Sequence, residues 1–456
     1  MIFRILISYI TFLVLIINFN SNNSDRLTSF LFVFFAAIIS ILILGRRGTF
    51  KYGFNVSKYF IIGFTIKIVI GFLFWEFYLF PDYFSINTSK IHFDHFEYLY
   101  TNMRMEELAN YRLSYGIFSF PIEEILRKSI YIHYLMSNIY LSGSFNIFDI
   151  AIQNSLFSIF TTLIITHIVK LEGGSSKQIK LALLLTIFLP MSLISTMIWR
   201  DVVGQFFVAL GGYILYKSIK QNKVLLTEKI ILFVLASLSM YMQRYVYAFF
   251  PVITIGIYYL FISRNKKTLF FLFPILVILI IYFDNLFLMS THLTESYGSN
   301  IKSITFWALI PFNIIRMLIG PFPWTNWFDF NDNSIFLIGD YLQSVVNISL
   351  VIFLIRIIVK NKKLLKTQSM LAGLSNSSIL FLILTSLFVF VGLGTVEIHI
   401  SYFSTGIIFL IPIICLSFNN KNILTILLRV FLFFIVTNLI FFIVDLGGMG
   451  IGNFLR

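Results

Sequence analysis

Apolar runs about 20 residues long recur along the 456-residue chain, and they restrict its possible folds more than any other feature. A helix of about 20 apolar residues crosses the roughly 30 Å of hydrocarbon in a lipid bilayer. Hydropathy predicts about thirteen such helices. Their centres lie near residues 11, 36, 70, 158, 189, 209, 236, 254, 279, 348, 384, 409 and 432. We therefore expect an all-α, polytopic integral membrane protein in which residues 1–456 form a single transmembrane domain.

Composition excludes several other classes of protein. Hydrophobic residues make up 58% of the chain and charged residues only 12%, which no soluble globular domain of this size shows. The net charge of +14 does not indicate a nucleic-acid partner, because the lysines and arginines lie in short clusters between apolar runs and not in one patch. Cys415 is the only cysteine, which excludes a disulfide framework and a thiolate zinc site.

Short basic clusters predict the orientation in the membrane. Five of them fall on the same side when the spans are threaded in order, as the positive-inside rule requires. They are Arg46-Arg47-Lys51-Lys58, Lys170-Lys177-Lys180, Lys217-Lys220-Lys223-Lys229, Arg264-Lys266-Lys267 and Lys360-Lys362-Lys363-Lys366. The amino terminus is then cytoplasmic, and two long loops, 81–146 and 291–334, face outward. Because binding and catalytic groups concentrate on loops carried by a rigid scaffold, we expect the working surface to be extracytoplasmic.

The first outer loop contains a candidate general base. Asp94 and Glu97 are three residues apart and share one face if the segment is helical. A carboxylate there could accept the proton of an attacking sugar hydroxyl. The alternative is a solvated helix whose acids only face water. His92 and His95 suggest a metal site, but two histidines without a third ligand are weak evidence, and we predict no metal.

Three arginines lie on the outer side, where the positive-inside rule does not explain them. Arg200 occupies a tight hairpin with Asp201, Arg244 occupies the corresponding corner of the next hairpin, and Arg316 lies in the second long loop. Charges kept at membrane depth usually serve a site, and arginine binds phosphate in a bidentate manner. The three arginines could hold the leaving diphosphate of a lipid-linked substrate, with Asp201 as a neighbouring substrate-binding group. Snorkelling to headgroups, or a local Arg200–Asp201 pair, is the alternative.

Other polar and aromatic residues are weaker candidates. His399 tops an outer hairpin and could contact a sugar or phosphate, although a hydrogen-bonded boundary histidine explains it as well. Trp324 could stack on a sugar ring, but interfacial tryptophans are ordinary membrane anchors. Lys67 and His167 lie in or near predicted spans and receive no role. The chain has no phosphate-binding G-x-x-x-x-G-K-[ST] loop, no H-E-x-x-H motif and no G-x-S-x-G elbow, so we expect neither nucleotide hydrolysis nor a cofactor.

These features together resemble membrane glycosyltransferases of the GT-C type and, among them, the bacterial O-antigen and capsule polymerases. The resemblance lies in the acid at Asp94, in the span with Pro190 that leads to Arg200-Asp201, in Arg244, and in Arg316 followed by Gly320-Pro321-Phe322-Pro323-Trp324. It covers the topology of nearly the whole chain. It implies that Asp94 assists the acceptor hydroxyl and that the three arginines hold the diphosphate. It further implies a bacterial inner-membrane location, polyprenyl-linked oligosaccharides as donor and acceptor, and a chain-length regulator protein as a partner.

Three alternatives to a polymerase stay open. A single-sugar transferase with a polyprenyl-phosphate donor would use the same residues. A flippase for lipid-linked oligosaccharide predicts short loops on both faces and charges in mid-membrane cavities, and the two long outer loops argue against it. An assembly subunit that only binds lipid or partner helices would not need the three outer arginines.

Overall fold

The computed structural model describes residues 1–17, 26–45, 54–74, 110, 114–115, 140–141, 147–189, 201–221, 231, 334–361, 407–417 and 420–446. Within these residues every regular element is a helix and no strand occurs. The helices are α1 (Ile2–Ile17), α2 (Arg26–Gly45), α3 (Val56–Phe74), α7 (Ile147–Leu171), α8 (Ser176–Ile187), α10 (Asp201–Gln221), α17 (Ser334–Asn361), α20 (Leu410–Ser417) and α21 (Asn420–Leu446). The all-α prediction is therefore confirmed for the described part of the chain.

Helices lie where hydropathy placed apolar spans. The predicted centres near 11, 36, 70, 158, 209, 348 and 432 fall inside α1, α2, α3, α7, α10, α17 and α21. The centre near 189 lies just after α8, the centre near 409 just before α20, and the centres near 236, 254, 279 and 384 lie outside the described residues.

One described helical stretch, Ala151–Leu171 in α7, is both long and apolar enough to cross a bilayer, and 94% of its most apolar window is buried. The central helix of a water-soluble protein would meet the same two criteria. The number of spans therefore stays a prediction.

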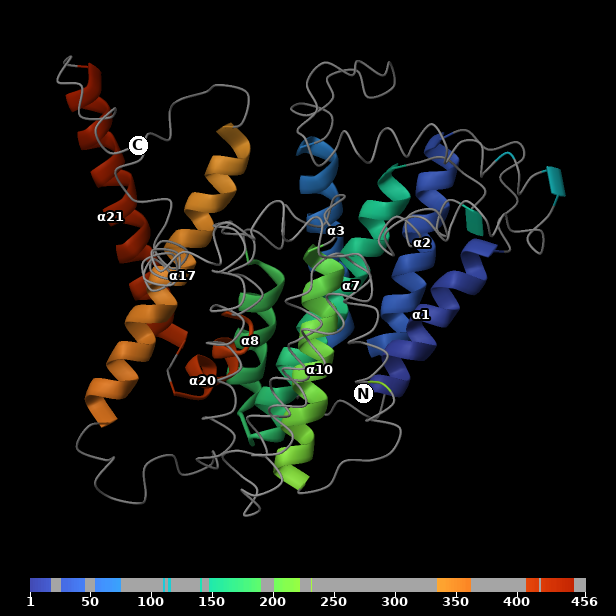
Figure 1. The fold of residues 1–456 in the computed structure, drawn as a ribbon, viewed down its shortest axis with the longest axis horizontal. Coiled ribbons are helices and arrows are strands. Elements are labelled where there is room, and N and C mark those ends of the chain that lie inside the picture. The colour runs from blue at the N-terminus through green and yellow to red at the C-terminus, as the bar shows by residue number, and fades with distance from the viewer. Residues whose placement is uncertain are drawn as a thin grey trace, which may run out of the picture. The chain divides into compact units, whose positions relative to one another are not determined.

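The chain forms two compact units. Unit 1 comprises residues 1–209, 237–245 and 330–339, and unit 2 comprises residues 210–236, 246–329 and 340–456. The unit boundaries fall inside α10 and α17, so each of these helices contributes residues to both units. Unit 1 holds the most extensively described packing, which joins α1, α2, α3, α7 and α8 (Figure 1).

α1 and α2 pack through a pair of small hydroxyl side chains. Ser8 Oγ lies 2.6 Å from Ser40 Oγ, and each hydroxyl is also within donor distance of the other residue's carbonyl oxygen, at 2.9 Å and 2.7 Å. Both serines are fully buried. Small polar residues at helix contacts let two backbones approach closely and satisfy each other without water.

Large apolar side chains are exposed on several of the described helices. On α1 the buried side is Ile5, Ser8, Phe12 and Ile16, whereas the exposed large side chains are Phe3, Leu6, Ile7, Ile10 and Val14. On α21 most exposed side chains are apolar, namely Leu424, Leu428, Leu432, Phe433, Val436 and Ile440, and Thr425 and Arg429 are exposed with them. A helix at a water-facing surface would carry polar residues on this side. The distribution is the one that a lipid-facing surface favours.

A glycine allows α3 and α8 to approach closely. A Cβ built on Gly63 would lie 2.5 Å from Cγ2 and 2.9 Å from Cδ1 of Ile187. Ile187 is fully buried and β-branched, so its Cγ2 has little freedom to move away.

We expect Gly63→Ala to destabilise the protein by about 1–3 kcal/mol through overpacking. Ile187→Ala removes the clashing atoms, so the two changes together should cost clearly less than the sum of their separate effects. The measurement is thermal unfolding of the purified full-length protein. Strict additivity of the two substitutions would contradict the close approach.

Candidate functional site

Most residues predicted to form the outer-face site lie outside the described residues. These are Asp94, Glu97, Arg200, Arg244, Arg316, Trp324 and His399, together with His92 and His95. Asp201 is described, as the first residue of α10. Acidic residues are favoured in the first turn of a helix, so Asp201 of the predicted Arg200–Asp201 corner belongs to α10 itself. Whether these side chains converge stays a prediction.

The described residues instead contain a polar interior centred on α7. Every side chain from residue 151 to residue 166 of this helix is buried. Gln153 Nε2 donates a hydrogen bond to the Tyr9 hydroxyl of α1 at 2.5 Å. The Tyr9 ring also packs on Phe157, with 5.3 Å between ring centroids. α7 is therefore the central helix of unit 1.

Aromatic contacts define one face of α7. The ring of Phe206, near the start of α10, lies 5.1 Å from the ring of Phe157 and 5.9 Å from that of Phe160. Gln153, Phe157 and Phe160 follow one another at spacings of four and three, which places them on one side of a helix. α1 and the first part of α10 pack against this side of α7.

A line of hydroxyl groups occupies the opposite side of α7. Ser155, Ser158, Thr162 and Thr166 follow at spacings of three, four and four, and all are buried. Successive residues of an α-helix are rotated by about 100° about its axis. Ser155 and Thr162 therefore lie roughly 180° around the helix from the aromatic face. α2, α3 and α8 are the other helices that pack on α7. We call these four residues the hydroxyl stripe.

Backbone carbonyls satisfy part of this polar interior. Thr162 and Thr166 donate to the carbonyl oxygens of Ser158 and Thr162, at 2.9 Å and 2.7 Å. Such bonds let a hydroxyl lie in an apolar interior without water. Ser155 Oγ is buried and has no hydrogen-bond partner among the residues described here. Since an unsatisfied buried hydroxyl costs free energy, Ser155 is a position where a ligand group or water would be stabilised.

Lys67 of α3 is the most unusual residue of this interior. Its side chain is 0% exposed, and it lies on the buried side of α3 with Phe60, Phe64 and Ile68. The Phe64 ring packs on Phe34 of α2, with centroids 5.6 Å apart. α3 also packs on α7. An ammonium group buried among apolar helices costs several kcal/mol relative to water, so charges kept at such positions usually serve a function.

Two buried acids belong to the same unit. Asp149, 5% exposed, lies in the first turn of α7, and Glu172, 7% exposed, lies in the turn that joins α7 to α8. α7 therefore carries a carboxylate near each end, with the hydroxyl stripe between them. In the described part of the chain, no group of three His, Cys, Asp or Glu side chains is placed to hold a metal ion.

The sequence reasoning gave Lys67 no role, although a signal was present. A single lysine interrupts the apolar segment Tyr59–Phe74, and hydroxyl residues recur on one side of a second apolar segment. Neither pattern alone shows that the two segments meet, and only the packing of α3 on α7 brings them together.

Comparison with known proteins gave no match to a family model, to a curated protein or to a solved structure.

We expect Lys67→Met to abolish the biological activity of the protein while its cellular level and its thermal stability are kept or rise. The reason is that methionine removes the buried charge and keeps most of the side-chain volume. The measurement pairs complementation of a deletion strain by the variant gene with thermal unfolding of the purified variant. Lys58→Met, at an exposed position of the same helix, is the control and should be active. Destabilisation by about 3–5 kcal/mol would instead identify Lys67 as half of a structural ion pair.

Proposed function

We propose that the chain is a polytopic protein of a bacterial inner membrane, with about thirteen transmembrane helices and a GT-C-like arrangement. The apolar exposed faces of α1 and α21 support the membrane location, because lipid is the solvent that stabilises such faces. Helices at the predicted positions, including α7, α10 and α17, support the topology.

We further propose that the protein is a glycosyltransferase that polymerises polyprenyl-diphosphate-linked oligosaccharide repeat units at the outer face. The observation that carries this proposal is the set of three arginines on the predicted outer side, where the positive-inside rule gives no reason for them. Guanidinium groups at that boundary suit a diphosphate whose lipid tail lies between the helices.

The reaction assigns one role to each group. The acceptor hydroxyl attacks the anomeric carbon of the donor glycan, and Asp94 or Glu97 takes the hydroxyl proton. The bond between the anomeric carbon and the diphosphate oxygen breaks, and Arg200, Arg244 and Arg316 stabilise the charge on the leaving diphosphate. Asp201, His399 and Trp324 complete the substrate contacts. A GT-C enzyme that moves one sugar from a polyprenyl phosphate would use the same groups.

A second candidate function is transport of lipid-linked oligosaccharide across the membrane. The buried Lys67 and the hydroxyl stripe favour it, because a flippase needs polar groups inside the bundle for the head group that it moves. In the polymerase, the same interior would serve the lipid-linked diphosphate near the bilayer.

Deletion of the gene distinguishes these functions. We expect the long polysaccharide ladder to disappear while a single repeat unit is retained on the cell surface. A uniformly altered repeat unit would indicate the single-sugar enzyme, and repeat units held on the cytoplasmic side would indicate the flippase. The measurement is gel analysis of surface polysaccharide together with fractionation of lipid-linked intermediates.

Each of Arg200→Ala, Arg244→Ala and Arg316→Ala should abolish chain extension without loss of the protein from the membrane, because the leaving diphosphate loses a bidentate partner. Arg429→Ala, at an exposed position of α21, is the matched control and should leave the ladder normal. Normal ladders from all three outer variants would reject the proposal that these arginines hold the diphosphate.

Asp94→Asn should lower the rate of chain extension by about 10²–10⁴-fold if Asp94 is the general base, whereas Glu97→Gln should have a smaller effect. The measurement is elongation of lipid-linked repeat units by the purified enzyme. The reverse order of effects would assign the base to Glu97, and full activity of both variants would reject a base in this loop.

A further inference from the structure

The first turns of α3 and α8 lie side by side. Lys180 Nζ of α8 lies 4.8 Å above the centroid of the Tyr59 ring of α3. Farther along both helices, Gly63 faces Ile187. Residue numbers increase in the same direction in both contacts, so α3 and α8 run parallel and begin at the same end.

The turn between α7 and α8 brings the end of α7 to this same place. Gly173 adopts a φ of 77°, which an L side chain rarely adopts. Its N–H donates to the Lys170 carbonyl at 3.0 Å, and the Gly174 N–H donates to the Val169 carbonyl at 3.0 Å. This pair of bonds is a Schellman motif, which ends α7 and reverses the chain. Lys170 is therefore near the start of α8.

The amino-terminal ends of α3 and α8 are both capped by polar side chains, and both add partial positive charge at this place. The Asn55 side chain accepts a hydrogen bond from the Lys58 N–H at 3.3 Å. Ser175 and Gln178 form a capping box at the start of α8, with the Ser175 N–H donating to Gln178 Oε1 at 2.9 Å. The amino-terminal end of a helix carries a partial positive charge that attracts phosphate.

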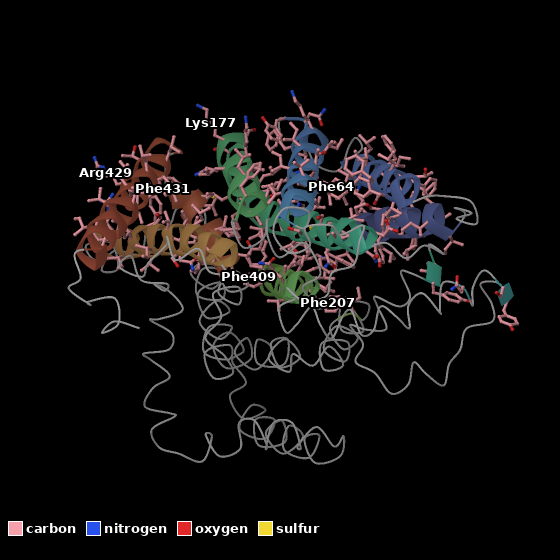
Figure 2. All side chains as sticks on the ribbon, turned by 90° about the horizontal axis from the view of Figure 1, so that it is seen from above. Phe64, Lys177, Phe207, Phe409, Arg429 and Phe431 are labelled. Carbon is pink, nitrogen blue, oxygen red and sulfur yellow. The ribbon has the colours of Figure 1, made fainter. Side chains whose placement is uncertain are left out.

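Three lysines surround these two starts, and we call them the lysine cluster: Lys58, Lys177 and Lys180. Lys58 and Lys177 are exposed, and Lys180 is held on the Tyr59 ring. Figure 2 shows Lys177 at one end of α8, beside α3. The charged groups on the neighbouring end of α7 are Lys170 and the buried Glu172, which offset each other. The cluster therefore keeps a net positive charge.

An apolar track begins at the cluster. Ile62 and Val69 follow Lys58 on the same side of α3, four and eleven residues on, and they are 42% and 49% exposed. A charged head at Lys58 and an apolar surface below it match the two parts of a phospholipid. A free phosphate ion would use the lysines and leave the apolar track unused.

We propose that the lysine cluster binds the phosphate of an anionic phospholipid headgroup, with an acyl chain lying along Ile62 and Val69. This inference rests on the membrane location proposed above and not on the proposed reaction. Basic pockets between helices on the cytoplasmic side recognise anionic lipid, and the basic clusters predict that side for this end of the helices.

The test compares phosphatidylglycerol with phosphatidylcholine of the same acyl chains, titrated into the delipidated full-length protein in detergent. The triple variant Lys58→Gln, Lys177→Gln, Lys180→Gln should bind phosphatidylglycerol roughly 100-fold more weakly at low salt, at about fivefold for each lysine. Its binding of phosphatidylcholine should not change. Added salt should weaken phosphatidylglycerol binding to the wild-type protein.

The control is a second triple variant, Lys217→Gln, Arg356→Gln, Arg429→Gln, which removes three positive charges at other places. It should keep the preference for phosphatidylglycerol. The exposed single variant Lys177→Gln serves if the triple variant does not fold. An unchanged preference in the cluster variants, an equal loss in the control, or full competition by soluble glycerol phosphate would overturn the proposal. A normal polysaccharide ladder in the cluster variants would leave the proposed enzyme function intact.

Discussion

Hydrocarbon offers no hydrogen-bond partners and little solvation for charge, and under the membrane location that we propose the whole structure depends on this constraint. Helices satisfy their own backbone groups, which explains why every described element is a helix. Polar side chains must then face the interior, as Ser8, Ser40 and the hydroxyl stripe do. Apolar side chains such as Phe3 and Leu424 can face outward without cost.

The polar interior is tolerated because most of its groups find partners within the protein. The two serines satisfy each other between α1 and α2, Gln153 bonds to Tyr9, and the threonines of α7 bond to carbonyls one turn back. Lys67 differs from these groups in chemical type, because it is a fully buried side chain that can carry a charge. A helix bundle built only for stability would place leucine or methionine at this position.

Sequence reasoning predicted the helices well, because each apolar run is long and its ends carry polar or basic residues. It gave Lys67 no role, since hydropathy averages over a window in which one lysine among isoleucines and phenylalanines changes little. The hydroxyl stripe was also missed, because its meaning depends on which side of α7 meets α3. The outer-face site depends on loops brought together in three dimensions, and its residues, apart from Asp201, lie outside the described part of the chain.

The proposed function requires the start of α8 and the start of α10 to lie on opposite sides of a membrane, with the lysine cluster inside and Arg200 outside. The natural chain has a single, buried cysteine, so labelling of introduced cysteines is a direct measurement. Lys177→Cys and Arg200→Cys would be made separately in a Cys415→Ser background and treated with a membrane-impermeant maleimide. The account predicts that the cysteine at position 200 reacts in intact spheroplasts and the cysteine at position 177 reacts only in inverted membrane vesicles. Reaction of both from the same side would contradict it.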